Sequence, residues 1–390
     1  MAIIYVTKRA NMRLLQGHPW VFKTDIDKVK GTYAPGDIVE VVTSDGNFIG
    51  KGYINNLSQI TIRLLTYIKD EAIDADFFYR KINACWQYRQ TIGFTTNCRL
   101  VFGEADGLPA LIIDKFGSYF VIQTLSLGID MRKTFIVDAL RKIFNVQGIY
   151  ERNDASVRDL EGLPQIKGFL TTPFNTTIEI IENGIKFLVD IENGQKTGYF
   201  LDQHHNRQAI QHIVKNADVL GVFTYTGSFE IHAAHYGAKS VTGLDISDNA
   251  IAMCNKNAAL NGYQNICNFT AVNAFDTLKQ WSKDKRQYNV VMLDPPAFTK
   301  SRANIAKAVA GYKEINLRGI KLVKPGGFLV TSSCTNLVSP ELFLKTIAQA
   351  AKDAKRKIRQ VTFNAQAADH PIMWEMENTN YLKFLIVQVL

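Results

Sequence analysis

Hydrophobic and polar residues alternate with a period of two in the first part of the chain. The alternation covers residues 38–42, 48–53 and 58–65, and the turn Asp45-Gly46-Asn47 separates the first two runs. Such runs broken by Asp/Gly turns are typical of β-hairpins. Residues 1–72 are therefore expected to form a small all-β domain.

The pattern becomes mixed over residues 73–183. A stripe of Phe78, Ile82, Cys85 and Trp86 predicts an amphipathic helix over residues 76–91. Strands are predicted at 110–114, 119–124 and 148–151, with a helix near 131–144. This pattern indicates a central α+β domain.

Strand and helix signals alternate from residue 184 to residue 390. Strands are predicted at 218–223, 240–244, 290–293, 327–331 and 381–390, and helices at 229–235, 247–260 and 303–322. This alternation predicts an α/β fold with a parallel, doubly wound, Rossmann-like sheet.

Charge and cysteine content narrow the class of protein. The 390 residues carry a formal net charge of +9, which favours a polyanionic partner such as nucleic acid, although ordinary solubility explains it equally well. None of the five cysteines forms a C-x-x-C pair, so neither disulfides nor a metal site is expected. With no signal peptide and no apolar run of about 18 residues, we expect a cytoplasmic protein without a membrane segment.

Two strand-like runs end in reactive groups. Residues 291–296 end in Asp294-Pro295-Pro296, and residues 330–335 contain Cys334. Ligands of open parallel sheets bind beyond the carboxyl ends of the strands, where a carboxylate and a thiol suit covalent chemistry on a pyrimidine ring. A strand-ending turn and a buried apolar cysteine are the structural alternatives.

A third run resembles a cofactor-binding turn. Residues 219–227 predict a strand, a turn containing Tyr225, Thr226 and Gly227, and the start of a helix. The next strand ends in Asp245-Ile246, where an acid commonly binds ribose hydroxyls. A nucleoside cofactor is expected, and the missing G-x-G-x-x-G argues against NAD. Helix capping by Asp245 or Ser247 is the alternative.

Five further runs complete a resemblance that covers nearly the whole chain. They are residues 102–109, 151–154, 194–203, 311–316 and 368–371. Together with Asp-Pro-Pro, Ser-Cys-Thr and the Thr-Gly turn, they resemble class I S-adenosylmethionine (SAM)-dependent methyltransferases, and most closely the large-subunit ribosomal RNA cytosine-C5 methyltransferase I family. The resemblance implies an N-terminal PUA-like RNA-binding β-barrel, a central RNA-binding domain and a C-terminal methyltransferase domain.

The resemblance also implies a mechanism and its residues. Cys334 would add to C6 of cytosine as a thiolate, and Asp294 would hold the base while C5 takes the methyl group. The cofactor SAM would be bound by Tyr225, Thr226, Gly227, Asp245, Ile246, Asn273, Ala274, Asp294, Pro295, Gln195 and Arg207.

Four positions depart from the family pattern. Gly221 lies where class I enzymes often carry an acidic or amide residue, and Asn273 lies where an acid often meets the adenine amine. His204 replaces an expected arginine, and Ala297 replaces a common lysine.

The expected partner is large-subunit ribosomal RNA. A homodimer is a further expectation, because two-fold symmetric dimers are the commonest soluble oligomers. An RNA amino-methyltransferase acting on guanine N2 or adenine N6 is the main alternative, because Asp-Pro-Pro with a nearby aromatic such as Phe298 serves those enzymes too. An RNA-binding protein that has lost catalysis is the alternative from another class.

Overall fold

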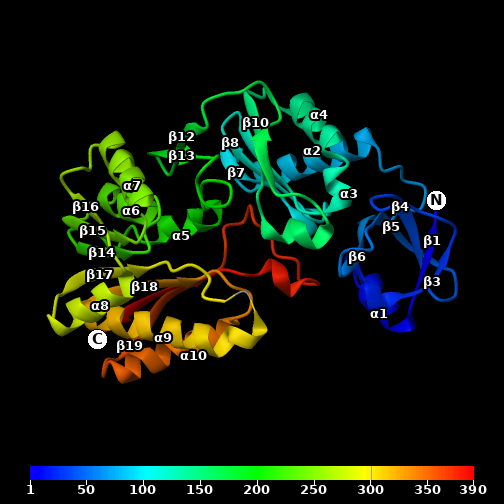
Figure 1. The fold of residues 1–390 in the computed structure, drawn as a ribbon. Coiled ribbons are helices and arrows are strands. Elements are labelled where there is room, and N and C mark those ends of the chain that lie inside the picture. Colours follow the sequence, from blue (N-terminus) through cyan, green and yellow to red (C-terminus); the bar gives the residue numbers. More distant parts are fainter. Residues whose placement is uncertain (300) are drawn as a thin grey trace. The chain divides into compact units, whose positions relative to one another are not determined.

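The computed structural model describes residues 1–299 and 301–390, which form two compact units (Figure 1). The first unit comprises Met1–Ile180, Val189–Leu201 and Ala368–Thr379. The second comprises Ile181–Leu188, Asp202–Ala367 and Asn380–Leu390. The domain boundaries expected near residues 72 and 183 stay predictions. No helix in the described part of the chain combines the length and apolar character that crossing a membrane requires.

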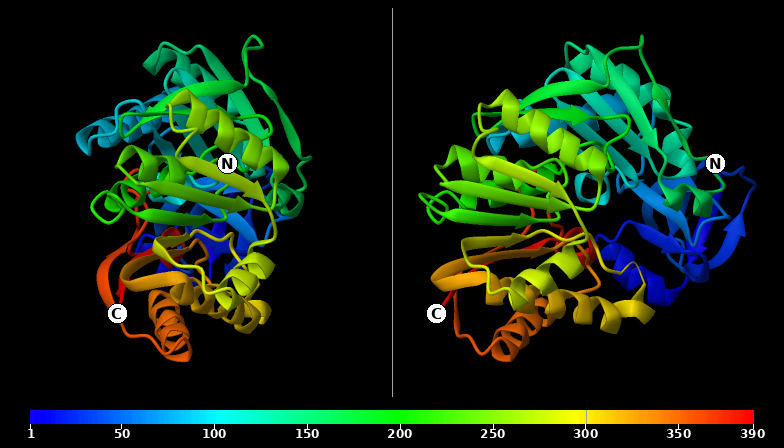
Figure 2. Two further views of the ribbon diagram at one scale, coloured as in Figure 1. Left: turned by 90° about the vertical axis from the view of Figure 1, so that its left-hand side faces the viewer. Right: turned by 60° about the vertical axis from the view of Figure 1, so that its left-hand side comes forward.

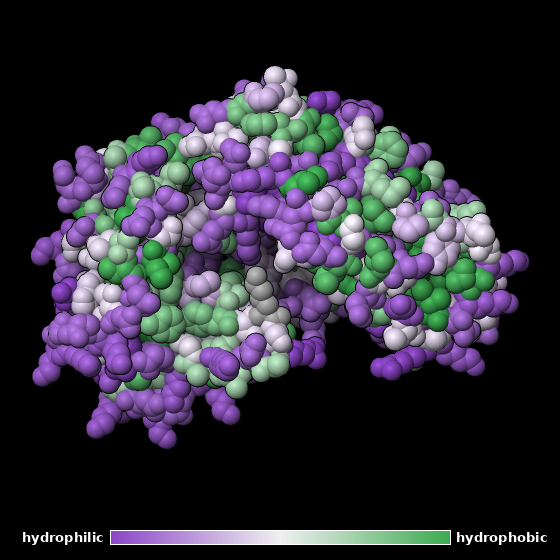
Figure 3. Space-filling view, in the orientation of Figure 1, coloured by the Kyte–Doolittle hydropathy of each residue, from purple (hydrophilic) through white to green (hydrophobic). Residues whose placement is uncertain are grey.

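The first unit begins with the predicted all-β part. Its six-stranded sheet has the order β2-β6-β5-β4-β1-β3. The strands are β1 (Ile3–Val6), β2 (Trp20–Phe22), β3 (Ile26–Lys30), β4 (Ile38–Val42), β5 (Phe48–Ile54) and β6 (Ile60–Thr66). The helix α1 (Lys8–Leu15), capped by the Thr7 side chain, places Ala10 and Leu14 in the apolar core. Met12 and Leu15 on the same helix are exposed, and Figure 3 shows hydrophobic side chains over α1.

A five-stranded sheet of order β11-β10-β9-β8-β7 follows. Its strands are β7 (Asn97–Phe102), β8 (Leu111–Phe116), β9 (Tyr119–Thr124), β10 (Gly148–Asn153) and β11 (Ile166–Phe169). The predicted helix is α2 (Ala75–Thr91), which Asp74 caps, and it packs against α4 (Lys133–Ile143). A short helix, α3 (Leu127–Asp130), precedes α4.

Buried polar contacts join the two sheets of the first unit. Arg63 on β6 forms an ion pair with Glu161, and the N···O distance is 2.9 Å with both side chains almost fully buried. Asn55 Nδ2 donates to Glu161 Oε2 at 2.9 Å. Tyr53 Oη donates to the carbonyl of Pro109 and accepts from Ser126. These contacts fix the all-β part on the central sheet.

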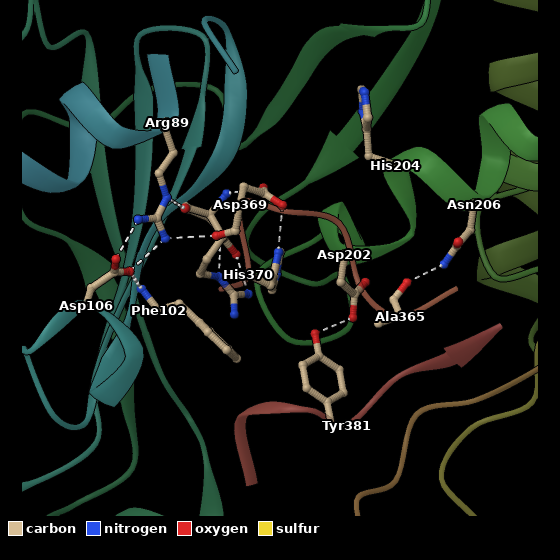
Figure 4. A network of polar contacts seen from close by, with 12 residues as sticks. Arg89, Phe102, Asp106, Asp202, His204, Asn206, Ala365, Asp369, His370 and Tyr381 are labelled. Atoms are coloured by element: carbon tan, nitrogen blue, oxygen red, sulfur yellow. Dashed lines mark hydrogen bonds and ion pairs between the residues drawn. The ribbon is translucent and has the colours of Figure 1, made fainter. Parts of the chain in front are cut away.

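The segment Ala368–Thr379 also belongs to the first unit, far from it in sequence. Arg89 binds Asp106 through two hydrogen bonds of 2.6 and 2.7 Å and donates to the carbonyl of Asp369 at 2.8 Å (Figure 4). The carboxylate of Asp369 accepts from the Arg99 amide and contacts His370. The resemblance run at residues 368–371 is thus a structural anchor.

The second unit contains a seven-stranded sheet of order β16-β15-β14-β17-β18-β20-β19. Its strands are β14 (Asp218–Val222), β15 (Ser240–Asp245), β16 (Cys267–Ala271), β17 (Tyr288–Leu293), β18 (Val323–Ser333), β19 (Ile358–Asn364) and β20 (Lys383–Val389). The hairpin of β12 (Thr177–Glu182) and β13 (Ile185–Asp190) precedes it. The doubly wound α/β sheet is confirmed for β14–β18, which are parallel, whereas β20 and β19 pair antiparallel.

Helices cover both faces of this sheet (Figures 1 and 2). α6 (Ser228–His235) and α7 (Asp248–Leu260) lie on one face, and α8 (Ala274–Lys283), α9 (Ile305–Leu322) and α10 (Pro340–Asp353) lie on the other. The short helix α5 (His204–Ala209) packs against α6. A core cluster that includes Leu220, Val291 and Leu329 lies beneath α9 and α10.

Candidate active site

The candidate site lies at the carboxyl ends of β14 and β17. These central strands pair in parallel, yet β15 follows β14 on one side while β17 lies on the other. The strand order reverses at this point, which is where open α/β sheets bind ligands. The turn after β14 and Asp294 after β17 therefore face the same edge.

The turn after β14 has an unusual backbone. Phe223, Tyr225 and Gly227 have φ values of 65°, 48° and 79°. The amide of Tyr225 donates to Asp245 Oδ2 at 2.9 Å, so the acid at the end of β15 holds the turn. A Cβ on Gly227 would lie 3.1 Å from Cys254 Sγ, which explains the glycine. Conformations of this kind cluster at ligand sites.

The second and third strands place the remaining cofactor candidates. Ser247 caps α7 through Ala250, as the capping alternative predicted for it. Ile246 is 72% exposed, which leaves an apolar surface beside Asp245. Asn273 caps α8, because its Oδ1 accepts from the amides of Phe275 and Asp276.

The turn fits a polar, nucleoside-like ligand. Among the described residues, Thr226 Oγ1 and Glu230 Oε2 are buried without a hydrogen-bond partner. Both belong to the turn or to the first turn of α6, where main-chain amides favour polar and anionic groups. Asp245 lies at the end of the next strand, the usual position for binding a ribose.

Asp294 lies partly buried where β17 ends. Its Oδ1 accepts hydrogen bonds from Ser332 Oγ and, at 3.0 Å, from Gln203 Nε2. Burial raises the pKa of Asp294 to about 6, although the Ser332 hydroxyl acts in the opposite direction. The carboxyl group is therefore able to hold or share a proton near neutral pH, and its role in binding a base stays a prediction.

Gln203 is itself held in place by its neighbours. Its Oε1 accepts from Asn206 Nδ2 at 2.7 Å. The preceding residue, Asp202, accepts from Tyr381 Oη at 2.6 Å (Figure 4). The segment before α5 is thus tied to the segment before β20.

Cys334 follows β18, the strand beside β17. Its Sγ lies 4.0 Å from the carbonyl oxygen of Pro295, so the thiol is close to the Asp-Pro-Pro turn. It is the one cysteine with partial exposure, whereas Cys85, Cys98, Cys254 and Cys267 are buried. Burial raises the pKa of these four thiols. Accessibility therefore separates Cys334 from the others.

Lys383, the first residue of β20, is a site residue that the sequence reasoning missed. It pairs in register with Ser333 and is 2% exposed. Burial lowers the pKa of Lys383 to about 8, while its electrostatic interaction with Cys334 opposes this shift. Lys383 thus provides a positive charge near the thiol.

Two predicted cofactor residues have other surroundings. Arg207 donates to both carboxylate oxygens of Glu182 at 2.5 and 2.9 Å, and the pair is almost fully buried. His204 contacts the same carboxylate at 3.2 Å. Gln195 lies in the first unit, next to Lys196, whose φ is 52°. Cofactor binding by Arg207 and Gln195 stays a prediction.

Several partners of the predicted residues come from distant segments. Ser332 has a local signal, because it lies near the end of β18 and only two residues before Cys334. Gln203 is the last residue of the resemblance run 194–203, but nothing in that run indicates its hydrogen bond to Asp294. Glu230 and Lys383 had no signal along the chain, since only helix packing and antiparallel register bring them to the site.

Comparison with known proteins identifies the family. Residues 4–67 match the model of a PUA-like domain, and residues 166–380 match that of S-adenosylmethionine-dependent methyltransferases. The chain is 40% identical to a ribosomal RNA large subunit methyltransferase I from Aeromonas salmonicida over 99% of this chain and 98% of that protein. It is 39% identical to the protein of the same name from Alteromonas mediterranea over 96% of each.

Solved structures support the fold. A SAM-dependent methyltransferase from Streptococcus mutans aligns over all of both chains with a TM-score of 0.84 at 21% identity. A methyltransferase in complex with SAH (S-adenosylhomocysteine) aligns equally completely with a TM-score of 0.85. With the family matches, these findings establish the expected fold and the cofactor SAM. The chain belongs to the ribosomal RNA large subunit methyltransferase I family of S-adenosylmethionine-dependent methyltransferases.

Proposed function

We propose that this enzyme methylates C5 of a cytosine in large-subunit ribosomal RNA. The names of its relatives support the RNA class, and the net charge of +9 suits a phosphate-rich substrate. The choice of C5 rests on one observation, the partly exposed thiol of Cys334 beside the turn that follows Asp294.

C5 of cytosine is a poor nucleophile, and a thiolate can activate it. Addition of the Cys334 sulfur to C6 forms an S–C6 bond and moves the ring's double-bond electrons toward C5 and N3. SAM, when bound, supplies the methyl group, and C5 takes this group as the methyl–sulfur bond breaks. A base then removes the C5 proton, and breaking of the S–C6 bond restores the aromatic ring and the thiolate.

Asp294 and Lys383 have separate roles in this scheme. The carboxyl group of Asp294, with a pKa raised to about 6 by burial, donates or shares a proton at N3 as negative charge develops there. Lys383 favours the thiolate of Cys334 by its charge. Gln203 and Ser332 orient the carboxyl group through Oδ1.

The target base must leave its helix to reach such a site. C5 and C6 of a paired cytosine are shielded by stacking, so the substrate is an unpaired or flipped nucleotide. RNA contacts by the N-terminal PUA-like domain and the central domain would then add shape recognition.

Transfer to an exocyclic amine is the second candidate, because an aromatic near Asp-Pro-Pro can stack on the base. Phe298, however, packs on Tyr312 with ring centroids 4.6 Å apart, and a Cβ on Gly311 would lie 3.1 Å from its ring. Because the Phe298 ring packs against α9, it is poorly placed for stacking on a nucleotide.

Trapping on RNA that contains 5-fluorocytidine tests the proposal. Fluorine at C5 prevents loss of the proton, so the S–C6 bond persists and the enzyme remains attached to RNA when SAM is present. We expect an adduct at Cys334 that Cys334→Ala abolishes, while Cys267→Ala, which changes a buried cysteine of the same unit, leaves it intact. Methyl transfer to unmodified RNA by Cys334→Ala at the normal rate would favour the amine. Neither adduct nor transfer, on RNA and on subunit particles, would favour a non-catalytic RNA-binding protein.

A further inference from the structure

A carboxylate fills the space above a glycine of the central strand. Gly221 on β14 has no side chain, and a Cβ built there would lie 1.8 Å from Glu230 Oε1. Glu230 is the third residue of α6, so its side chain reaches back over the strand. The space next to position 221, where the family pattern often has an acidic or amide side chain, is therefore occupied by a carboxylate from the helix.

The carboxyl group of Glu230 has one oxygen without a partner among the described residues, although the group also accepts a hydrogen bond from its own backbone amide. The side chain is 2% exposed, and its Oε2 accepts no hydrogen bond from any described residue. Buried polar atoms are normally satisfied, and exceptions often mark a ligand site. The orphan oxygen lies in the first turn of the helix that follows the cofactor turn.

Two acids of the site show where this carboxyl group lies. Asp245, the last residue of β15, and Asp294, which follows β17, both raise the pKa of Glu230 electrostatically. The first holds the cofactor turn, and the second belongs to the proposed transfer centre. Glu230 is thus near both acids, one on the proposed ribose side of the site and one at the proposed transfer centre.

We propose that Glu230 is a cofactor-positioning residue that binds the positively charged methionyl end of SAM, replacing a side chain absent at Gly221. The cation is either the α-ammonium group or the sulfonium. This assignment rests on SAM as the cofactor and holds whichever base is methylated.

The electrostatic surroundings supply a second, independent prediction. The pKa of Glu230 is raised to about 8, chiefly by burial and to a smaller extent by Asp294 and Asp245, while a hydrogen bond from its own backbone amide acts in the opposite direction. Cys254 on α7 and Cys267 on β16 also interact with Glu230, and both carry raised pKa values of their own. Near pH 7 the carboxyl group is therefore mostly protonated without a ligand, and binding of a cation releases its proton.

Calorimetric titration with three ligands tests the assignment. SAH keeps the ammonium group but lacks the sulfonium charge, and 5′-methylthioadenosine lacks the amino-acid part and both charges. We expect Glu230→Gln to weaken SAM binding about 10- to 100-fold and to leave methylthioadenosine unchanged. An equal loss for SAH identifies the ammonium group, and a loss for SAM alone identifies the sulfonium. Glu341→Gln, in the first turn of α10, is the matched control.

Proton release and a double variant complete the test. Titration in two buffers of different ionisation enthalpy should show release of most of a proton per SAM by the wild type and none by Glu230→Gln. Gly221→Asn should clash with Glu230 and lose binding, whereas Gly221→Asn with Glu230→Ala should recover it. Unchanged SAM affinity in Glu230→Gln, an equal loss for methylthioadenosine, or no proton release by the wild type would overturn the proposal. None of these measurements requires RNA or turnover. Their outcome is therefore independent of whether the enzyme methylates C5 of cytosine.

Discussion

Lys383 Nζ donates a hydrogen bond to the carbonyl oxygen of Thr335, the residue after Cys334. A second bond runs from Nζ to the carbonyl of Tyr381 at 2.9 Å. Both acceptors are neutral, so the ammonium charge is not cancelled by them. Burial lowers the pKa of Lys383 to about 8, and the interaction with Cys334 acts in the opposite direction. This coupling means that a thiolate and an ammonium at this position stabilise each other.

Replacing Lys383 should therefore make Cys334 less reactive. We expect Lys383→Met to slow alkylation of Cys334 by iodoacetamide about tenfold at pH 7, because the thiolate fraction falls as the thiol pKa rises. The rate should recover at higher pH. The label maps to one site, because the other cysteines are buried. Lys324→Met, at the opposite end of β18 and paired with Asp218, should leave the rate unchanged. Equal rates for Lys383→Met and wild type at every pH would contradict the coupling.

The ionised carboxylate of Asp294 should destabilise the folded protein at neutral pH. Its pKa is raised from 3.8 to about 6, chiefly by burial, so the folded state retains a proton that the unfolded state loses. Stability from this group therefore falls as pH rises through this window, and the full cost, at most ~3 kcal/mol, is present above it. Functional sites commonly carry such costs.

Asp294→Asn should consequently be more stable than the wild type at pH 8 and close to it at pH 4, while losing methyl transfer. Thermal melting at both pH values checks this difference. Asp276→Asn, an exposed change in the first turn of α8, should not gain stability as pH rises. A melting difference between Asp294→Asn and the wild type that is the same at both pH values would show that the carboxyl group carries no burial cost.

The positions of Asp294 and Cys334 could be predicted, because each residue follows an apolar run in the sequence. An apolar run followed by Asp294 or Cys334 places each residue at the carboxyl edge, and parallel pairing then brings the ends together. Lys383 was not predictable, because its approach depends on the antiparallel register of β20. Glu230 required knowledge of which strand residue α6 covers.

Four elements of the second unit that the sequence pattern does not predict are edge strands or helices with local caps. β16 and β19 are the two edges of the seven-stranded sheet. β16 has only two buried side chains, Cys267 and Phe269, and β19 has none, so their hydrophobic pattern is weak. α8 begins at a local signal, because Asn273, which the resemblance implies as a cofactor residue, caps the helix through Oδ1. α10 carried a local start signal, Ser339 followed by Pro340.

Arg207 should affect stability more than cofactor binding. Burial alone would raise the pKa of Glu182, but Arg207 and His204 outweigh it and hold the value well below the usual range. Removing one partner of a buried pair commonly costs about 3–5 kcal/mol. We expect a loss of this size for Arg207→Met in urea unfolding, and a smaller loss when Glu182→Gln is added.

The pH dependence of this pair has the opposite sign to that of Asp294. A lowered carboxyl pKa stabilises the fold above the unfolded value of 4.5 and loses this effect as pH falls through the folded value. The destabilisation in Arg207→Met should therefore shrink in acid. Strong loss of SAM affinity in a variant that unfolds like the wild type would instead support the predicted contact between Arg207 and the cofactor.

The all-β part of the first unit should separate from the central sheet when Glu161 is truncated. Glu161→Ala leaves Arg63 buried without its ion-pair partner and removes an acceptor of Asn55, so we expect a loss of about 3–5 kcal/mol. Because the lost contacts join two sheets, unfolding should split into two transitions in calorimetry. The exposed pair Asp76–Arg80 provides the control, since Asp76→Ala should cost less than about 1 kcal/mol and preserve a single transition for this unit. If Glu161→Ala melted with the wild-type profile, the buried pair would contribute nothing to joining the sheets, and Tyr53, through Pro109 and Ser126, would be the remaining connection to test.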